Sequence, residues 1–201
     1  SEMCIRDSIK GGNTYKQVYS DLFSYIASHT TIPTLQQVLD NNHDLTYHQF
    51  FAGTLAGAGV ATSQANFVAI GQGAGYTNGG SEVTAIGYYA GATADAVSSL
   101  IAIGRNAGNS LYSGSNGNIA IGESSMRNGR VSQSIGIGIN ALVNATGFGT
   151  YNIGIGTNGL ANNSGDYNIG IGAEAGQGTS GDRNIAFGTS SAYYNQASYV
   201  I

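Results

Sequence analysis

The chain has 201 residues, including 32 glycines and one proline, and only 9% of its residues are charged. This composition indicates a repetitive or fibrous protein, while collagen is excluded because glycine does not recur at every third position, and disorder is disfavoured by 41% hydrophobic residues. The net charge of −4, with no lysine after Asn66, excludes a nucleic-acid partner, whose phosphates require clustered Lys and Arg.

The first 65 residues do not repeat. Residues 1–8 resemble a translated sequencing adapter and are treated as a non-native leader, together with Cys4. Residues 9–65 are expected to form an N-terminal cap or collar. Apolar residues at helical spacing predict a short amphipathic helix at 14–28, and Pro33 ends that run. The Gly/Ala-rich segment 50–63 is interpreted as a connector. The cap would shield an open strand edge, and a trimerisation or attachment collar is the alternative.

No metal, cofactor or membrane site is predicted. One cysteine and the scattered His29, His43 and His48 do not have the spacing of metal ligands. No window approaches the 18 or more apolar residues that a membrane-spanning helix needs, and the start of the chain has no secretory signal.

Residues 66–201 contain eight copies of a four-residue signature, in which an apolar, a small and an apolar residue precede a glycine. The closing glycines are 16 to 18 residues apart: Gly71, Gly87, Gly104, Gly122, Gly138, Gly156, Gly172 and Gly188. Turn clusters such as Asn78-Gly79-Gly80 lie between the copies. Ile201 falls 16 residues after Ile185, so we expect the chain to stop within a ninth copy.

Each signature is expected to be a β-strand, in which alternate side chains point to opposite faces. One face carries the isoleucines, including Ile103, Ile121, Ile137, Ile155 and Ile171, and the other carries only alanine or glycine. Stacked coils would join the isoleucines into a shared interior. The bare face is then expected to pack either against two further copies of the chain or against a second sheet of the same coil.

Two further columns are expected along the stacked coils. Asparagine immediately precedes the signature at four places and could form a hydrogen-bonded ladder: Asn118, Asn152, Asn168 and Asn184. Tyr151, Tyr167 and Arg183 share one repeat position. They form a candidate edge for contact with a glycan or receptor, with solvent-facing turn decoration as the alternative.

The signature with its following alanine, as in Ile101 to Ala107, is similar to the head repeats of trimeric autotransporter adhesins. That resemblance implies a parallel β-roll and a trimer, although the repeat length of 16 to 18 differs from the family's. The segment 33–40, leading into copies such as 165–172, resembles phage tail-fibre and related bacterial surface proteins. Both resemblances imply an extracellular attachment function.

Catalytic and ligand-binding alternatives are weaker. Residues 154–159 match the dinucleotide-binding glycine pattern, but no helix is expected after them. Calcium-binding repeats need an aspartate in nearly every coil, and only Asp166 and Asp182 occupy matching places. The carboxylates are spread over different coils, which argues against a glycan-cleaving β-helix enzyme.

The sequence therefore predicts an all-β protein, a parallel β-solenoid or β-roll of eight repeats of 16–18 residues with a short, partly helical N-terminal cap. We expect a non-enzymatic fibre shaft or head, a homotrimer on a virion or bacterial surface. A bacterial trimeric adhesin or extracellular filament is the first alternative, and a glycan-active enzyme is the second.

Overall fold

The structure is a computed structural model that describes residues 49–60, 65–93, 97–146 and 149–198, all within one compact unit, Asp44–Ile201. The leader at 1–8, the helix expected at 14–28 and the segment 33–40 lie outside the described residues.

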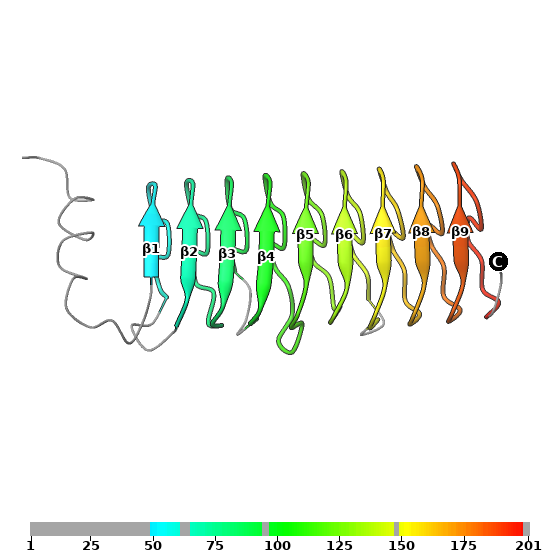
Figure 1. Cartoon of the computed structure of the whole chain (residues 1–201), viewed down its shortest axis with the longest axis horizontal. Helices are drawn as coiled ribbons and strands as arrows, with labels where there is room; N and C mark the ends of the chain where they lie inside the picture. The colour runs from blue at the N-terminus through cyan, green and yellow to red at the C-terminus, as the bar shows by residue number, and fades with distance from the viewer. Residues whose placement is uncertain (1–48, 61–64, 94–96, 147–148, 199–201) are drawn as a thin grey trace, which may run out of the picture. The chain divides into compact units, whose positions relative to one another are not determined.

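The described chain winds into a parallel β-solenoid, as the sequence predicts (Figure 1). Its strands form one parallel sheet, and their order in the sheet follows their order in the chain. Within the described residues there are nine strands and no helix: β1 Gln49–Ala52, β2 Phe67–Ile70, β3 Val83–Ile86, β4 Leu100–Ile103, β5 Ile119–Ile121, β6 Ile135–Ile137, β7 Ile153–Ile155, β8 Ile169–Ile171 and β9 Ile185–Phe187.

The solenoid begins one coil earlier than the eight signatures indicate. Strand β1 lies where the sequence suggests a connector, and Phe50 of β1 pairs in register with Val68 of β2. Gly53 closes this coil with φ 131°, in the same way that Gly71 closes the next with φ 123°. The coil is hidden in the sequence because Phe51 occupies the position that is alanine or glycine in the other coils.

Equivalent residues stack in columns along the solenoid. Ile103 pairs with Ile121, Ile121 with Ile137, and Ile137 with Ile155. The predicted register of isoleucine over isoleucine is therefore confirmed.

The closing glycines form a column of their own. Gly138 has φ 132°, a region that L side chains rarely adopt, and a Cβ on it would lie 2.5 Å from the carbonyl oxygen of Gly156 in the next coil. Gly87 and Gly104 have the same relation at 2.6 Å. Glycine is required at this position because the backbone both turns sharply and touches the neighbouring coil.

The structure reverses the expected roles of the two strand faces. The small residues point into the coil, and Ala69, Ala102 and Ala120 are completely buried. The isoleucines point outward, and Ile101 and Ile137 remain 39% and 38% exposed. The expected isoleucine interior is therefore wrong, and so is the expected packing of copies on a small-residue face.

The physical reason is that the coil is too thin for isoleucine. A Cβ added to Gly154 or Gly170 would lie only 2.6 Å or 2.5 Å from a carbonyl oxygen of the returning chain. The strand and the return segment therefore touch almost backbone to backbone. Only glycine fits between them in these coils, a methyl group fits in the coils of Ala102 and Ala120, and a branched side chain fits in neither.

The returning chain is a run of tight turns and not a second strand. After β2, Gly73, Gly75 and Thr77 have φ values of 65°, 61° and 53°. The Gly73 N–H donates to the Thr54 oxygen of the preceding coil at 2.9 Å, and the Gly75 N–H donates to the Ala90 oxygen of the next at 2.8 Å. The return is thus hydrogen-bonded from coil to coil, as the strands are, and the alternative of a second sheet is also wrong.

Candidate functional site

Among the described residues, acidic and metal-ligating side chains do not converge on a site. No group of three or more His, Cys, Asp or Glu side chains is placed to hold a metal ion there. Glu82, Glu123 and Glu174 lie in different coils. No helix in the same part of the chain has the length and apolar character needed to cross a membrane. The prominent features are instead continuous surfaces and ladders.

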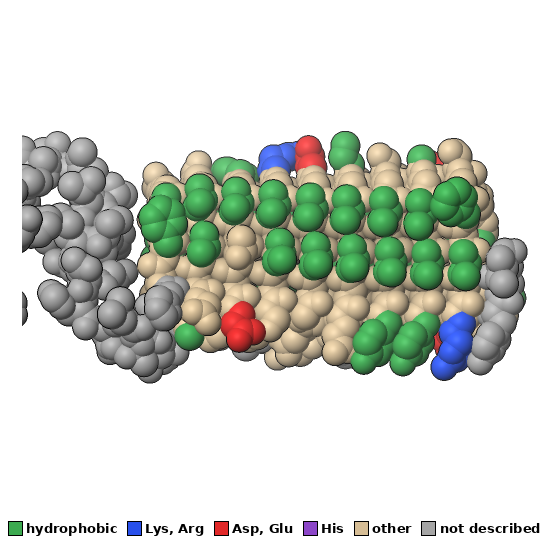
Figure 2. Space-filling view, in the orientation of Figure 1, with side chains coloured by type: hydrophobic (Ala, Val, Ile, Leu, Met, Phe, Trp, Pro, Cys, Tyr) green, Lys and Arg blue, Asp and Glu red, His purple; other side chains and the backbone are tan. Residues whose placement is uncertain are grey.

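The largest of these surfaces is the outward side of the sheet, here called the isoleucine face. It consists of two parallel rows of side chains that run over all nine strands in Figure 2. The first row is Phe50, Val68, Thr84, Ile101, Ile119, Ile135, Ile153, Ile169 and Ile185, and the second is Ala52, Ile70, Ile86, Ile103, Ile121, Ile137, Ile155, Ile171 and Phe187. No charged residue occurs in either row.

The isoleucine face is large enough to form the greater part of a protein interface. Nine strands about 4.8 Å apart make it about 40 Å long, and two rows about 7 Å apart make it about 12 Å wide, on the order of 500 Å². Contiguous apolar patches on monomers rarely exceed a few hundred Å² and often mark interaction sites. A stable interface buries about 800 Å² on each partner, so this face would supply more than half of such an area.

The predicted asparagine column is present in the interior of the C-terminal coils, but Asn152 and Asn168 bond to the backbone of the next coil and not to each other's side chains. Asn152 is completely buried, and its Oδ1 accepts the Asn168 backbone N–H at 2.8 Å. Its Nδ2 donates to the Gly165 carbonyl at 2.9 Å. Asn168 repeats the pattern towards Asn184 and Gly181. These amide groups already make hydrogen bonds between successive coils, so they stabilise the stack and are not available to a ligand.

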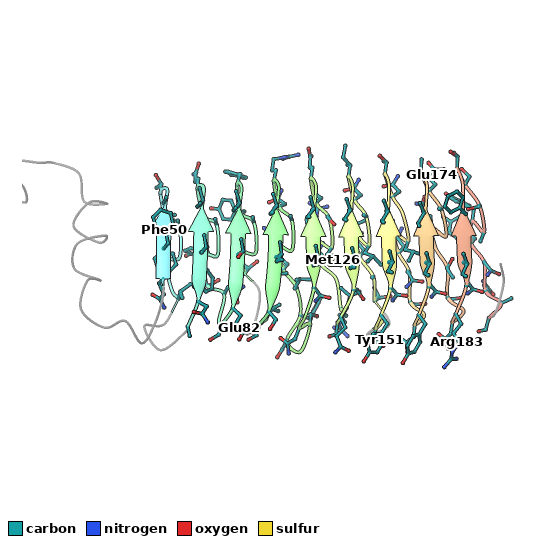
Figure 3. All side chains as sticks on the ribbon, viewed as in Figure 1. Phe50, Glu82, Met126, Tyr151, Glu174 and Arg183 are labelled. Carbon is teal, nitrogen blue, oxygen red and sulfur yellow. The ribbon has the colours of Figure 1, made fainter. Side chains whose placement is uncertain are left out.

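The tyrosine edge is also present as a column. Tyr151 and Tyr167 stack with ring centroids 5.0 Å apart and an angle of 13° between the planes. The Arg183 guanidinium lies 5.2 Å from the Tyr167 ring centroid, and Figure 3 shows Tyr151 and Arg183 on one edge of the solenoid. Stacking turns both faces of the Tyr167 ring towards neighbours in the column. The face on which a sugar would stack is therefore occupied, and the ring edge with its hydroxyl remains for contact.

The two aspartates considered for calcium have a structural role. The Asp166 Oδ1 accepts the Thr150 N–H at 2.8 Å, and the Asp182 Oδ1 accepts the Asp166 N–H at 2.8 Å. Ser81 and Ser98 do the same in the N-terminal coils through their hydroxyls. The carboxylates thus continue a column of side-chain acceptors that bind the backbone of the preceding coil.

The glycine pattern at 154–159 belongs to the coil and not to a phosphate loop. Gly154 lies in β7, Gly156 is the closing glycine with φ 117°, and Gly159 packs against Ile155. The chain continues into turns, and a nucleotide would need a helix N-terminus there.

Comparison of the chain with protein-family models, with curated proteins and with solved structures found no match. The fold and its surfaces are therefore the basis for a functional proposal.

Sequence reasoning identified the columns but not the exposed face. A signal was available in the small position of the signature, which is glycine in β6, β7 and β8 and alanine in β2 to β5 and β9. The three glycines follow coils in which Met126, Leu142 and Leu160 are buried, and their added Cβ atoms would lie 3.2 Å, 3.2 Å and 2.9 Å from those side chains. Because the small position is glycine where a large buried side chain lies next to it, the small position must itself point into the coil.

Proposed function

We propose that the chain is a structural segment of an extracellular fibre, a shaft or head that assembles as a homotrimer on its isoleucine faces and mediates surface attachment. The observation that carries the proposal is the apolar face along the coil axis, which Thr84 alone interrupts. An apolar strip that follows the long direction of a solenoid suits side-by-side packing of identical rods, because every coil contributes the same two side chains to the contact.

Assembly also answers a stability problem. Each coil encloses at most one or two large apolar side chains, so the core of a single copy is thin. Packing the isoleucine faces together would give the copies a second, shared core of apolar side chains, as in the interfaces of homo-oligomers. Several copies in one fibre would present each weak surface contact several times, which raises avidity through effective concentration.

The proposal follows the phage tail-fibre resemblance, and a bacterial trimeric adhesin or extracellular filament is the alternative origin for the same assembly. In either case we expect a cell-surface glycan or receptor as partner, and no nucleic acid, membrane insertion or cofactor. The Tyr151 and Tyr167 hydroxyls and the Arg183 guanidinium offer polar contacts for such a partner.

The mass of the particle in solution, measured by light scattering, tests the proposal. We expect three times the chain mass of 20.5 kDa for the wild type, and a monomer for Ile137→Glu, which adds a charge to the isoleucine face in β6, next to the central strand. Thr157→Glu is the matched control, because it adds the same charge at an exposed repeat position where Glu123 already occurs. A wild-type monomer, or equal masses for the two variants, would contradict the proposal.

A further inference from the structure

Thr84 is the single polar side chain in the two rows of the isoleucine face. It lies in β3, half-buried, with Val68 on one side of it in the row and Ile101 on the other. Neither neighbour in its row offers a hydrogen-bonding side chain. In an isolated copy water satisfies the hydroxyl, and in an assembly a neighbouring copy must do so.

We propose that Thr84 fixes the direction and the register in which copies pack on their isoleucine faces. This inference rests on the proposed assembly. When copies lie parallel and in register, all Thr84 side chains fall in one layer of the shared core. A threonine hydroxyl both donates and accepts, so these side chains can satisfy one another directly or through a shared water.

Other arrangements leave the hydroxyl unsatisfied. A shift by one coil places Thr84 opposite the β2 or β4 layer, where the first row carries Val68 and Ile101. Antiparallel copies with aligned centres place β3 opposite β7, where the face presents Ile153 and Ile155. A buried hydroxyl without a partner disfavours both arrangements.

The position of Thr84 along the solenoid determines what it can specify. Strand β3 lies away from the central strand β5. A polar residue in β5 would meet its own copy in parallel and in antiparallel pairs alike, and would fix register without direction. A single polar residue among apolar contacts sets partner register in coiled coils by the same physical means. From β4 to β8 both outward positions are isoleucine in every coil, so these coils specify no register.

Distances between nitroxide labels on different copies test this inference. The label is placed at Ser180→Cys, an exposed turn residue beyond β8, in a Cys4→Ser background. We expect one narrow distance population for the wild-type face, with other arrangements below about one tenth of the particles. For Thr84→Val, which preserves shape and removes the hydroxyl, we expect shifted or antiparallel arrangements to rise at least about threefold.

A rescue variant separates a register role from a local structural role. Thr84→Val combined with Ile153→Thr moves the hydroxyl to the same row of β7, also away from the centre. We expect the narrow population to return, because alignment needs one polar layer and not the β3 site itself.

Two results would overturn the inference while leaving the proposed function intact. One is a distance distribution for Thr84→Val that is as narrow as that of the wild type. The other is a distance distribution for the double variant that is as broad as that of Thr84→Val. A monomeric wild type without distances between copies would overturn both proposals.

Discussion

The N-terminal and C-terminal coils fill the same narrow interior from opposite sides. In β2, β3 and β4 the strand supplies the large side chain, Phe67, Val83 or Leu100, and all three are completely buried. In the coils that follow β5, β6 and β7 the return segment supplies it through Met126, Leu142 and Leu160. Each of these six coils buries at least one large apolar side chain, and either the strand or the return segment can provide it.

Where the strand or the return segment provides the large side chain, the segment opposite it has a smaller residue at the facing position. Opposite Phe67 the return carries Gly75, whose added Cβ would lie 2.5 Å from the Phe67 ring. In the C-terminal coils the strand position of Phe67 is polar instead, and Asn152 and Asn168 use it for the ladder. The difference teaches that the same interior can be filled from the strand or from the return segment, although the coil of β8 has Asn168 and Gly176 at the two positions and no large apolar side chain at either.

The largest expected loss of stability occurs in both regions, because the closing glycines are common to both. Gly87→Ala and Gly138→Ala each force a Cβ against the next coil, 2.6 Å and 2.5 Å from a carbonyl oxygen, at φ values near +130°. We expect each to lower the free energy of unfolding by more than about 3 kcal/mol, measured by urea denaturation.

Gly188→Ala is the matched control for the closing glycines. Its φ is 106°, but nothing lies within 4 Å of the added Cβ. Only the backbone strain remains, so we expect a loss of about 1 kcal/mol. Equal losses at Gly138 and Gly188 would show that contact between coils does not dictate glycine here.

The next effect is confined to the C-terminal coils. Asn152→Val converts the ladder position to the apolar type of β3 and removes the acceptor of the Asn168 N–H. It also removes one of two donors to the Gly165 carbonyl, which keeps its bond from the Asn163 Nδ2. One buried group left unpaired costs about 1–3 kcal/mol, so we expect a loss of about 2 kcal/mol on urea denaturation. Thr157→Val, at an exposed site, should change stability by less than about 0.5 kcal/mol. A loss at Asn152 as small as this would mean that the ladder adds little to stability.

The smallest expected effect is an energetic coupling between the strand and the return segment, and it tests whether their side chains fill one shared interior space. The Cβ added by Gly75→Ala would lie 2.5 Å from the Phe67 ring, which is its nearest neighbour. Phe67→Val, the residue type of β3 at this position, shortens that neighbour. We expect the double variant to be more stable than the sum of the single changes predicts, by about 1–2 kcal/mol in a double-mutant cycle. Additive changes would indicate that the strand and the return segment fill the interior independently.

The repeat, the parallel register and the asparagine column could be predicted because each depends on spacing along the chain. The direction of the strand faces could not, because period-two alternation is the same whether Ile121 or Ala120 points inward. The thickness of the coil decides it, and thickness depends on the contact between strand and return. β1 was missed for the same reason, since Phe51 shows that an interior position need not be small at the end of the stack.

The candidate surfaces were predicted unevenly. Tyr151, Tyr167 and Arg183 were aligned by repeat position alone, and the structure places them in one column. Their stacking, which occupies the ring faces, depends on side-chain angles that spacing does not specify. The importance of Thr84 follows only once its row is known to face outward.

The most direct test of the account is thiol labelling of two adjacent single-cysteine variants, Ala120→Cys and Ile121→Cys, in a Cys4→Ser, Ile137→Glu background in which copies are separated. Ala120 is completely buried and Ile121 lies on the outward face. We predict that the cysteine at 121 reacts at the rate of an exposed thiol and that the cysteine at 120 reacts only when the solenoid unfolds. Fast reaction at 120 with protection at 121 would contradict the account.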